Sequence, residues 1–88
     1  MKIKEGFLLR TVAGEHVVIA IGKASLVLNG IIKLNDSGAL LWNAIMDGAG
    51  EDQLIGLLAR TYEIPEAQAE KDVGSFLETL RGAGCLEE

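Results

Sequence analysis

Short apolar runs interrupted by glycine fill the first part of the chain and predict β-strands. Residues 7–12 and 16–21 are rich in aliphatic and β-branched side chains. The three residues between them, Ala13-Gly14-Glu15, form a short turn in which glycine can adopt a positive φ. The two runs therefore predict a β-hairpin.

A second turn signal, Asn29-Gly30, stands between the apolar runs 26–28 and 31–34. Asn and Gly both tolerate a positive φ, so this pair between apolar runs is a strong hairpin signal. The pattern predicts a strand over 31–34. It leaves open whether 24–28 is a strand or an ordered loop.

From residue 35 onward apolar residues recur every three or four positions, which predicts helices. The first helix is opened by capping residues at 35–37 and ended by the glycines at 48–50. A second begins at Glu51, and Pro65 separates it from a third over 66–81. The stripes predicted to be buried are Leu41, Trp42, Ile45 and Met46, then Leu54, Ile55, Leu58 and Tyr62, then Ala69, Val73, Phe76, Leu77 and Leu80, with Leu86 returning to the core.

The order of these elements predicts an α+β fold. A small three-stranded antiparallel sheet is followed by three helices that cover one of its faces, with winged-helix character. The chain has 88 residues and shows no linker or repeat, so we expect residues 1–88 to form a single domain.

Charge argues against nucleic acid as a partner. The chain has 8 basic and 13 acidic residues, a net charge of −5, and the basic residues are spread along it. The third helix, which a winged helix would place on DNA, carries four acids and two bases. The N-terminus has no apolar signal core, and no apolar run is long enough to span a bilayer. These features predict a cytoplasmic protein with neither nucleic-acid nor membrane partners.

No set of catalytic or metal-binding residues emerges. His16 lies in a predicted strand, and Cys85 lies at the far end of the chain. A general base needs a partner within hydrogen-bond reach, and a metal site needs several converging ligands. The G-x-G sequences at 48–50 and 82–84 follow helices, where they end the helix rather than cradle a dinucleotide. We therefore expect no enzyme activity, no cofactor and no metal.

The strand 31–34 suggests a binding site. If it lies at the sheet edge, its unpaired backbone groups can accept an extended peptide as a new strand. The third helix offers small and charged residues beside its core stripe, and the gap would be rimmed by Lys33, Lys71 and Arg81. In the alternative interpretation, Lys33 only blunts the edge and nothing pairs there. The flank of the helix consists of Ala67, Lys71, Gly74, Glu78 and Arg81.

The segment from Asn29 to Trp42 resembles the PqqD family, most specifically in its strand, Leu-Asn-x-Ser-Gly and Trp pattern. The resemblance spans Phe7 to Leu86 and implies three strands followed by three helices. It also implies a recognition element for ribosomally made precursor peptides. In such elements the leader adds to the third strand beside the third helix, and the complex presents the peptide to a modifying enzyme, often a radical SAM protein. The founding role is in pyrroloquinoline quinone biosynthesis. Further matching residues are Tyr62, Glu63, Ile64, Asp72, Val73, Phe76, Leu77, Leu80 and Gly84.

Carried over to this chain, the resemblance implies a peptide-binding set on the strand and on the helix. The set is Ile31, Ile32, Lys33, Leu34, Lys71, Gly74, Ser75, Glu78 and Arg81. Gly50 departs from the family pattern, which often has a Thr or Ser cap there. The apolar segment 26–28 also departs, and it leaves a homodimer open. Two other functions remain: an adaptor that dimerises or docks without a peptide ligand, and a winged-helix DNA binder.

Overall fold

A computed structural model describes residues 1–28 and 30–87 of the chain. Its main sheet has three antiparallel strands in the order β2-β3-β4: β2 (Phe7–Val12), β3 (Glu15–Ala20) and β4 (Ile32–Leu34). The two residues between β2 and β3, Ala13 and Gly14, have φ values of 53° and 80°. Both therefore adopt the left-handed conformation that a two-residue hairpin turn requires, and the first predicted hairpin is confirmed.

The segment before β4 is not a strand. Residues Gly22–Leu26 form a short 3₁₀ helix, η1, and β4 pairs with β3 through Val18 opposite Ile32 and His16 opposite Leu34. Of the two alternatives that the sequence left open for 24–28, the structure has the one that is not a strand, and 26–28 does not pair with 31–34. Burial of Ala24 explains the difference, because η1 packs this residue beside Gly6. The turn residue Asn29 lies outside the described residues.

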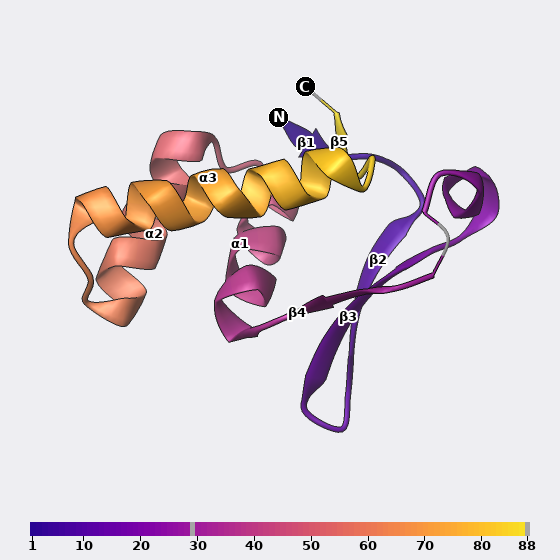
Figure 1. Cartoon of the computed structure of the whole chain (residues 1–88), viewed down its shortest axis with the longest axis horizontal. Helices are drawn as coiled ribbons and strands as arrows, with labels where there is room; N and C mark the ends of the chain where they lie inside the picture. Colours follow the sequence, from indigo (N-terminus) through magenta and orange to yellow (C-terminus); the bar gives the residue numbers. More distant parts are fainter. Residues whose placement is uncertain (29, 88) are drawn as a thin grey trace.

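Three helices follow the sheet and gather on one side of it (Figure 1). They are α1 (Asp36–Met46), α2 (Glu51–Tyr62) and α3 (Glu66–Gly82). This order confirms the predicted fold class. The cap of α1 is also confirmed, because Asn35 Oδ1 accepts a hydrogen bond of 2.8 Å from the Gly38 N–H. Among the described residues, no helix is long and apolar enough to cross a membrane.

The two ends of the described chain meet in a second, two-stranded sheet. β1 (Lys2–Ile3) pairs antiparallel with β5 (Leu86–Glu87), and the two lie side by side in Figure 1. The Lys4 N–H extends the pairing with a 2.8 Å hydrogen bond to the Cys85 carbonyl. This sheet was not predicted, although the return of Leu86 to the core was, and Leu86 is buried.

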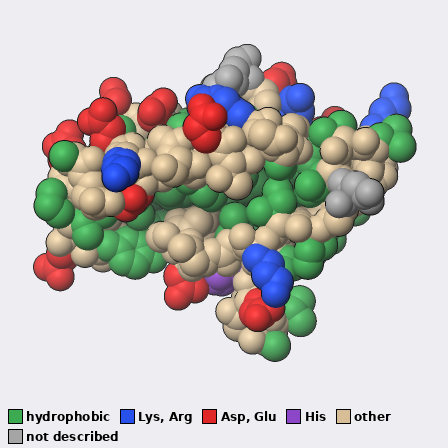
Figure 2. Space-filling model, in the orientation of Figure 1, with side chains coloured by type: hydrophobic (Ala, Val, Ile, Leu, Met, Phe, Trp, Pro, Cys, Tyr) green, Lys and Arg blue, Asp and Glu red, His purple; other side chains and the backbone are tan. Residues whose placement is uncertain are grey.

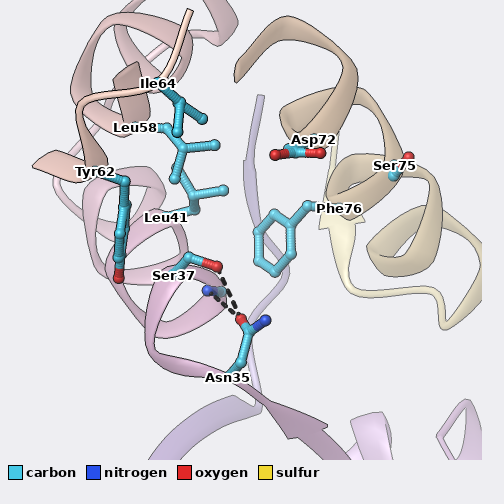
Figure 3. Close-up of a pocket in the computed structure, with 10 residues that line it drawn as sticks. Asn35, Ser37, Leu41, Leu58, Tyr62, Ile64, Asp72, Ser75 and Phe76 are labelled. Carbon is cyan, nitrogen blue, oxygen red and sulfur yellow. Dashed lines mark hydrogen bonds between the residues drawn. The ribbon is translucent and has the colours of Figure 1, made fainter. Parts of the chain in front are cut away.

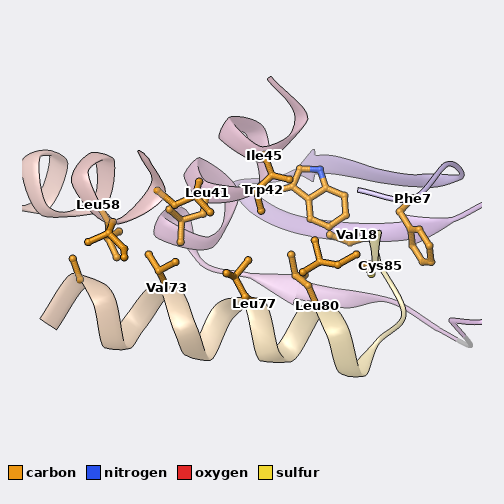
Figure 4. Packing of buried hydrophobic residues seen from close by; sticks show 14 of the residues in the cluster. Phe7, Val18, Leu41, Trp42, Ile45, Leu58, Val73, Leu77, Leu80 and Cys85 are labelled. Atoms are coloured by element: carbon orange, nitrogen blue, oxygen red, sulfur yellow. The ribbon is translucent and has the colours of Figure 1, made fainter. Parts of the chain in front are cut away.

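The core lies between α3, α1 and the inner face of the main sheet (Figure 4). Trp42 and Ile45 of α1 and Leu77 and Leu80 of α3 are all 1% exposed or less. The predicted stripes are confirmed apart from three residues on their margins. Met46 and Tyr62 are exposed, and Phe76 is only partly buried. Met46 and Tyr62 are the last residues of α1 and α2, where each helix ends.

Candidate peptide-binding site

No strand formed by residues 1–28 or 30–87 lies along the outer edge of β4. Within these ranges β4 is last in the sheet order and pairs with β3 alone. Among the described residues, no backbone hydrogen bond outside this ladder involves Ile32, Lys33 or Leu34. The condition on which the sequence-based binding site depended, an edge position of this strand, is therefore met, and half of its backbone groups face away from β3.

The side chains of β4 alternate between the two faces of the sheet. Ile32 and Leu34 are partly buried and pack against the core, whereas Lys33 between them is exposed. Ile31, just before the strand, is 57% exposed. An extended chain beside this edge would meet aliphatic side chains on the inner face and a cation on the outer face.

A hollow with an apolar floor separates β4 from α3, as the space-filling view in Figure 2 shows. The partly buried apolar side chains that these elements contribute next to the core include Ile32, Leu34 and Phe76. Gly38 at the start of α1 has no side chain, which allows Leu34 of β4 and Phe76 of α3 to lie close to it. A Cβ at this position would lie 3.3 Å from Leu34 Cβ and 3.4 Å from Phe76 Cε1. A glycine at position 38 therefore lets β4, α1 and α3 converge at this end of the hollow.

A pocket of about 500 Å³ lies beyond this convergence (Figure 3). Phe76 and Asp72 of α3 point into it opposite Leu41 and Leu58. Asp72 is its only charged lining residue among those described. The Oδ1 atom of Asp72 accepts a 2.8 Å hydrogen bond from Gln68 Nε2. The complete lining is Asn35, Ser37, Gly38, Leu41, Leu58, Tyr62, Ile64, Asp72, Ser75 and Phe76.

This pocket borders β4, because Asn35 directly follows the strand. The Asn35 carboxamide is held by two hydrogen bonds, from the Gly38 N–H and from Ser37 Oγ at 3.0 Å. The cap was predicted from sequence, but its place beside a binding surface was not. Tyr62, which the sequence placed in the buried stripe of the second helix, is instead exposed and lines this pocket.

The predicted flank of α3 forms a separate hollow. Its lining comes from α3 alone, and it has a volume of about 570 Å³. Glu78 and Arg81 within it are joined by an ion pair of 3.5 Å. The predicted residues of α3 thus line one hollow, and those of β4 lie along one strand; neither this hollow nor the pocket beside α1 is lined by residues of both groups. Only Ser75 borders both this hollow and the pocket beside α1. The lining is Ala67, Glu70, Lys71, Gly74, Ser75, Glu78 and Arg81.

The only cysteine and the only histidine of the chain, Cys85 and His16, lie apart from the surfaces described above, one in the core and the other in contacts between elements. Cys85 is fully buried, and burial raises the pKa of its thiol, with a smaller opposing effect of the Lys4 charge. His16 is held by Thr11 and Asp36. Within the described part of the chain, no group of three or more His, Cys, Asp or Glu residues could hold a metal ion.

Comparisons with known proteins agree with this architecture. A family model described as coenzyme PQQ synthesis protein D (PqqD) matches residues 15–86. Among the curated proteins, none matches the chain. The solved structure "TbiB1 in Complex with the TbiA(beta) Leader Peptide" superposes with a TM-score of 0.82 at 20% identity, over 99% of this chain and 95% of that one. "Lasso peptide synthetase B1 complexed with the leader peptide" gives 0.80 at 20% identity, over 99% and 96%. At this identity the two structures establish a shared fold.

Proposed function

The chain belongs to the PqqD family, and from this premise we propose that it is a non-catalytic recognition domain for a precursor peptide. It binds the leader of a ribosomally synthesised precursor by strand addition and presents it to a modifying enzyme of the radical SAM class. The observation that carries the proposal is the unpaired edge of β4 beside an apolar hollow. The two solved structures of similar fold are complexes with leader peptides, which supports a peptide of this kind as the ligand.

In the proposed complex the leader lies along residues 31–34 as a fourth strand, about 4.8 Å from β4. Its alternate side chains enter the hollow in front of Phe76 and Ser75. The remaining predicted residues, Lys71, Gly74, Glu78 and Arg81, line the adjoining hollow on α3, and a ligand reaches them by extending past Ser75, which also borders the pocket beside α1.

The energetics favour a moderate affinity. Each main-chain hydrogen bond contributes about 0.5–1.5 kcal/mol net. Two or three buried aliphatic side chains add about 1.5–3 kcal/mol each. Ordering a disordered peptide costs about 2–5 kcal/mol, besides the loss of translational and rotational freedom. Backbone pairing alone therefore gives little affinity, and specificity must come from the side chains that enter the hollow.

Amide-shift mapping tests the proposal. The isotope-labelled chain is titrated with synthetic peptides that cover the leaders of candidate precursors, and with scrambled peptides of the same composition. We expect the matched leader to shift the amides of residues 31–34 and of the facing part of α3, and the scrambled peptide to leave them unchanged. Equal shifts with both peptides, or shifts confined to other surfaces, would count against the site.

The same titration separates the other two functions. An adaptor that works without a peptide predicts no shift with any leader, together with a dimer that forms as the concentration rises. A DNA-binding function predicts binding to a duplex that weakens steeply with salt.

A further inference from the structure

The main sheet has a second apolar face, which the helices do not cover. Side chains alternate along a strand, so Leu9 and Val18, which pair with each other and pack on the core, have their neighbours on the opposite face. Those neighbours include Leu8, Val17 and Ile19. Among the described residues, these three do not belong to the core cluster, although each is partly buried. Leu8 and Ile19 stand directly opposite each other.

This sequence pattern is unusual for a sheet with one solvated face. Such a sheet normally alternates apolar and polar residues, and continuous apolar runs are typical of strands covered on both faces. Residues 17–21 form a continuous run, but only one face is covered within the chain. Three further apolar residues around this sheet are more than half exposed: Val12 at 65%, Ile21 at 52% and Ile31 at 57%. The outer face therefore has the composition of a surface that another molecule covers.

The charge on this outer face is also distinctive. The strand register places Arg10, Val17 and Lys33 in one row across the three strands, and the exposed Glu15, two residues before Val17, lies on the same face. Two strand spacings put the backbones of Arg10 and Lys33 about 10 Å apart. Within the described part of the chain neither forms a salt bridge, and the Arg10 guanidinium donates only to the neighbouring Leu9 carbonyl, at 3.1 Å. A row of two cations around a valine complements a surface with two carboxylates around an apolar centre.

A hollow of about 730 Å³ adjoins the outer face where β2 begins. It is lined by Leu8 and Ile21 together with Glu5 and Lys23, and by smaller residues between them. The outer face and this hollow thus combine apolar contact area with a depression into which a partner's side chain can insert. Interfaces with a partly apolar centre and a charged rim have this composition.

A peptide added to β4 would continue this outer face. Every second side chain of a fourth strand points to the same side of the sheet as Lys33. A molecule that covers the face would then contact the chain and the bound peptide together. This step rests on the proposed function, and it links the face to the molecule that acts on the peptide.

We propose that the outer face of the main sheet docks the peptide-modifying enzyme, with the bound leader completing the contact. The enzyme would contribute an apolar patch flanked by acidic residues. A face-to-face pairing of two copies is the alternative occupant of this face, and it would not depend on a bound leader. The test below separates it from docking of the enzyme.

The test measures two affinities on one set of variants. Arg10→Glu reverses a charge two strands away from the peptide edge, and Ile19→Thr removes an apolar contact while keeping β-propensity. Arg60→Glu, an exposed residue of α2, is the matched charge control. Binding of the leader peptide and of the modifying enzyme encoded beside the chain is measured by calorimetry, with the chain empty and loaded. Circular dichroism establishes that each variant is folded.

We expect Arg10→Glu and Ile19→Thr to weaken enzyme binding by at least about tenfold. Peptide affinity should stay within about twofold of the parent's, and Arg60→Glu should resemble the parent in both assays. The loaded parent should bind the enzyme more tightly than the empty parent.

Several outcomes would overturn the inference. Arg10→Glu and Ile19→Thr could bind the enzyme as well as Arg60→Glu does. Alternatively, Ile19→Thr could abolish a dimer of the parent chain, or both variants could abolish binding to anionic lipid vesicles. The outer face would then belong to a second copy or to a membrane. Failure of the leader to bind any variant or the parent would contradict the proposed function instead, and the empty-chain measurements would still test the face.

Discussion

His16 on β3 and Asp36 at the start of α1 lie in direct contact, with Nε2 and Oδ1 2.8 Å apart. The other ring nitrogen, Nδ1, lies 2.8 Å from Thr11 Oγ1 on β2. The imidazole therefore connects two strands of the sheet to the first turn of α1. It does so beside Leu34, the last residue of β4 and the strand partner of His16. This contact links the end of the proposed binding strand to the first turn of α1.

A double-mutant cycle with His16→Asn and Asp36→Asn should give a small coupling free energy. The Asp36 side chain is 87% exposed, so water screens its interaction with the ring. Exposed pairs of this kind contribute about 0.2–1 kcal/mol. Urea unfolding of the parent, the two single variants and the double variant gives the coupling directly. A coupling above about 2 kcal/mol would show that the pair acts as a buried one.

The sequence predicted what depends on local patterns. The cap at Asn35 and the apolar stripe around Trp42 follow from residues three or four positions apart, and both are confirmed. The pairing of β1 with β5 joins two-residue segments about 85 positions apart, and a two-residue strand has no periodicity to detect. Met46 shows another limit of prediction from sequence. Periodicity identifies the buried face of a helix, but not the residue at which the packed neighbours of that face end.

The candidate site divides in the same way. The edge position of β4 could only be assumed from the sequence, because the order of strands along a chain does not determine their order in the sheet; the structure supplies the order β2-β3-β4. Which side of α3 faces that edge does not follow, because a core stripe has a flank on each side. The sequence favoured the flank with Gly74, and this choice stays a prediction. The structure adds that Phe76, which the sequence assigned to the core stripe, lies with Leu34 of β4 beside Gly38. Only the three-dimensional packing of α1 against α3 distinguishes the two flanks.

Proline substitutions at Ile32 and Lys33 should have opposite effects. Successive residues of an antiparallel strand direct their backbone N–H groups to opposite sides, so one of these two faces β3 and the other faces the free edge. The variant that removes the edge N–H should stay folded and bind the leader at least about tenfold more weakly. The other should lower the free energy of unfolding. Urea unfolding and peptide titration measure both effects, and two folded variants that bind like the parent would exclude strand addition at β4.

Gly74→Leu and Ser75→Leu should show which side of α3 the peptide contacts. A Cβ at Gly74 would meet nothing within 4 Å, and glycine costs about 1 kcal/mol relative to alanine inside a helix. We therefore expect Gly74→Leu to fold at least as stably as the parent and to bind the leader within about twofold of it. Ser75 borders the pocket beside α1, and Ser75→Leu should weaken binding more. The reverse order would show that the ligand crosses α3.

Cys85 should be unreactive in the folded chain. Its side chain is fully buried, and burial raises the pKa of the thiol above the ordinary value of 9.0, so little thiolate is present. A disulfide reagent at about pH 8 should label the native chain at least about tenfold more slowly than the chain in urea. Labelling at equal rates would show that β5 opens freely.

The raised pKa of Cys85 should also make the free energy of unfolding fall at alkaline pH. The folded chain holds the thiol proton more tightly than the unfolded chain does, so this contribution is complete below the ordinary value of 9.0. It is lost as the pH rises through the raised pKa, because over this range the unfolded chain binds fewer protons than the folded chain does. Cys85→Ala should remove this part of the alkaline decline in urea unfolding, and an unchanged decline would contradict the assignment.

Gly84→Ala should be more destabilising than its backbone conformation alone predicts. Gly84 follows α3 with a φ of 77°, where alanine costs about 1–2 kcal/mol. In addition, a Cβ at this position would collide with Val27 Cγ1, in the segment that leads to β4. Gly14 is the matched control, because its φ is 80° and a Cβ there would meet nothing within 4 Å. The loss of unfolding free energy in Gly84→Ala beyond that in Gly14→Ala therefore measures the collision.

Val27→Ala then tests whether this collision has the proposed cause. Val27 is 60% exposed, so its own truncation should cost less than about 1 kcal/mol. In the Val27→Ala background, Gly84→Ala should lose only as much stability as Gly14→Ala does, because the colliding methyl is gone. Urea unfolding of the four variants gives this comparison. If the additional loss of unfolding free energy in Gly84→Ala persists without the Val27 side chain, then contact with Val27 is not what constrains position 84.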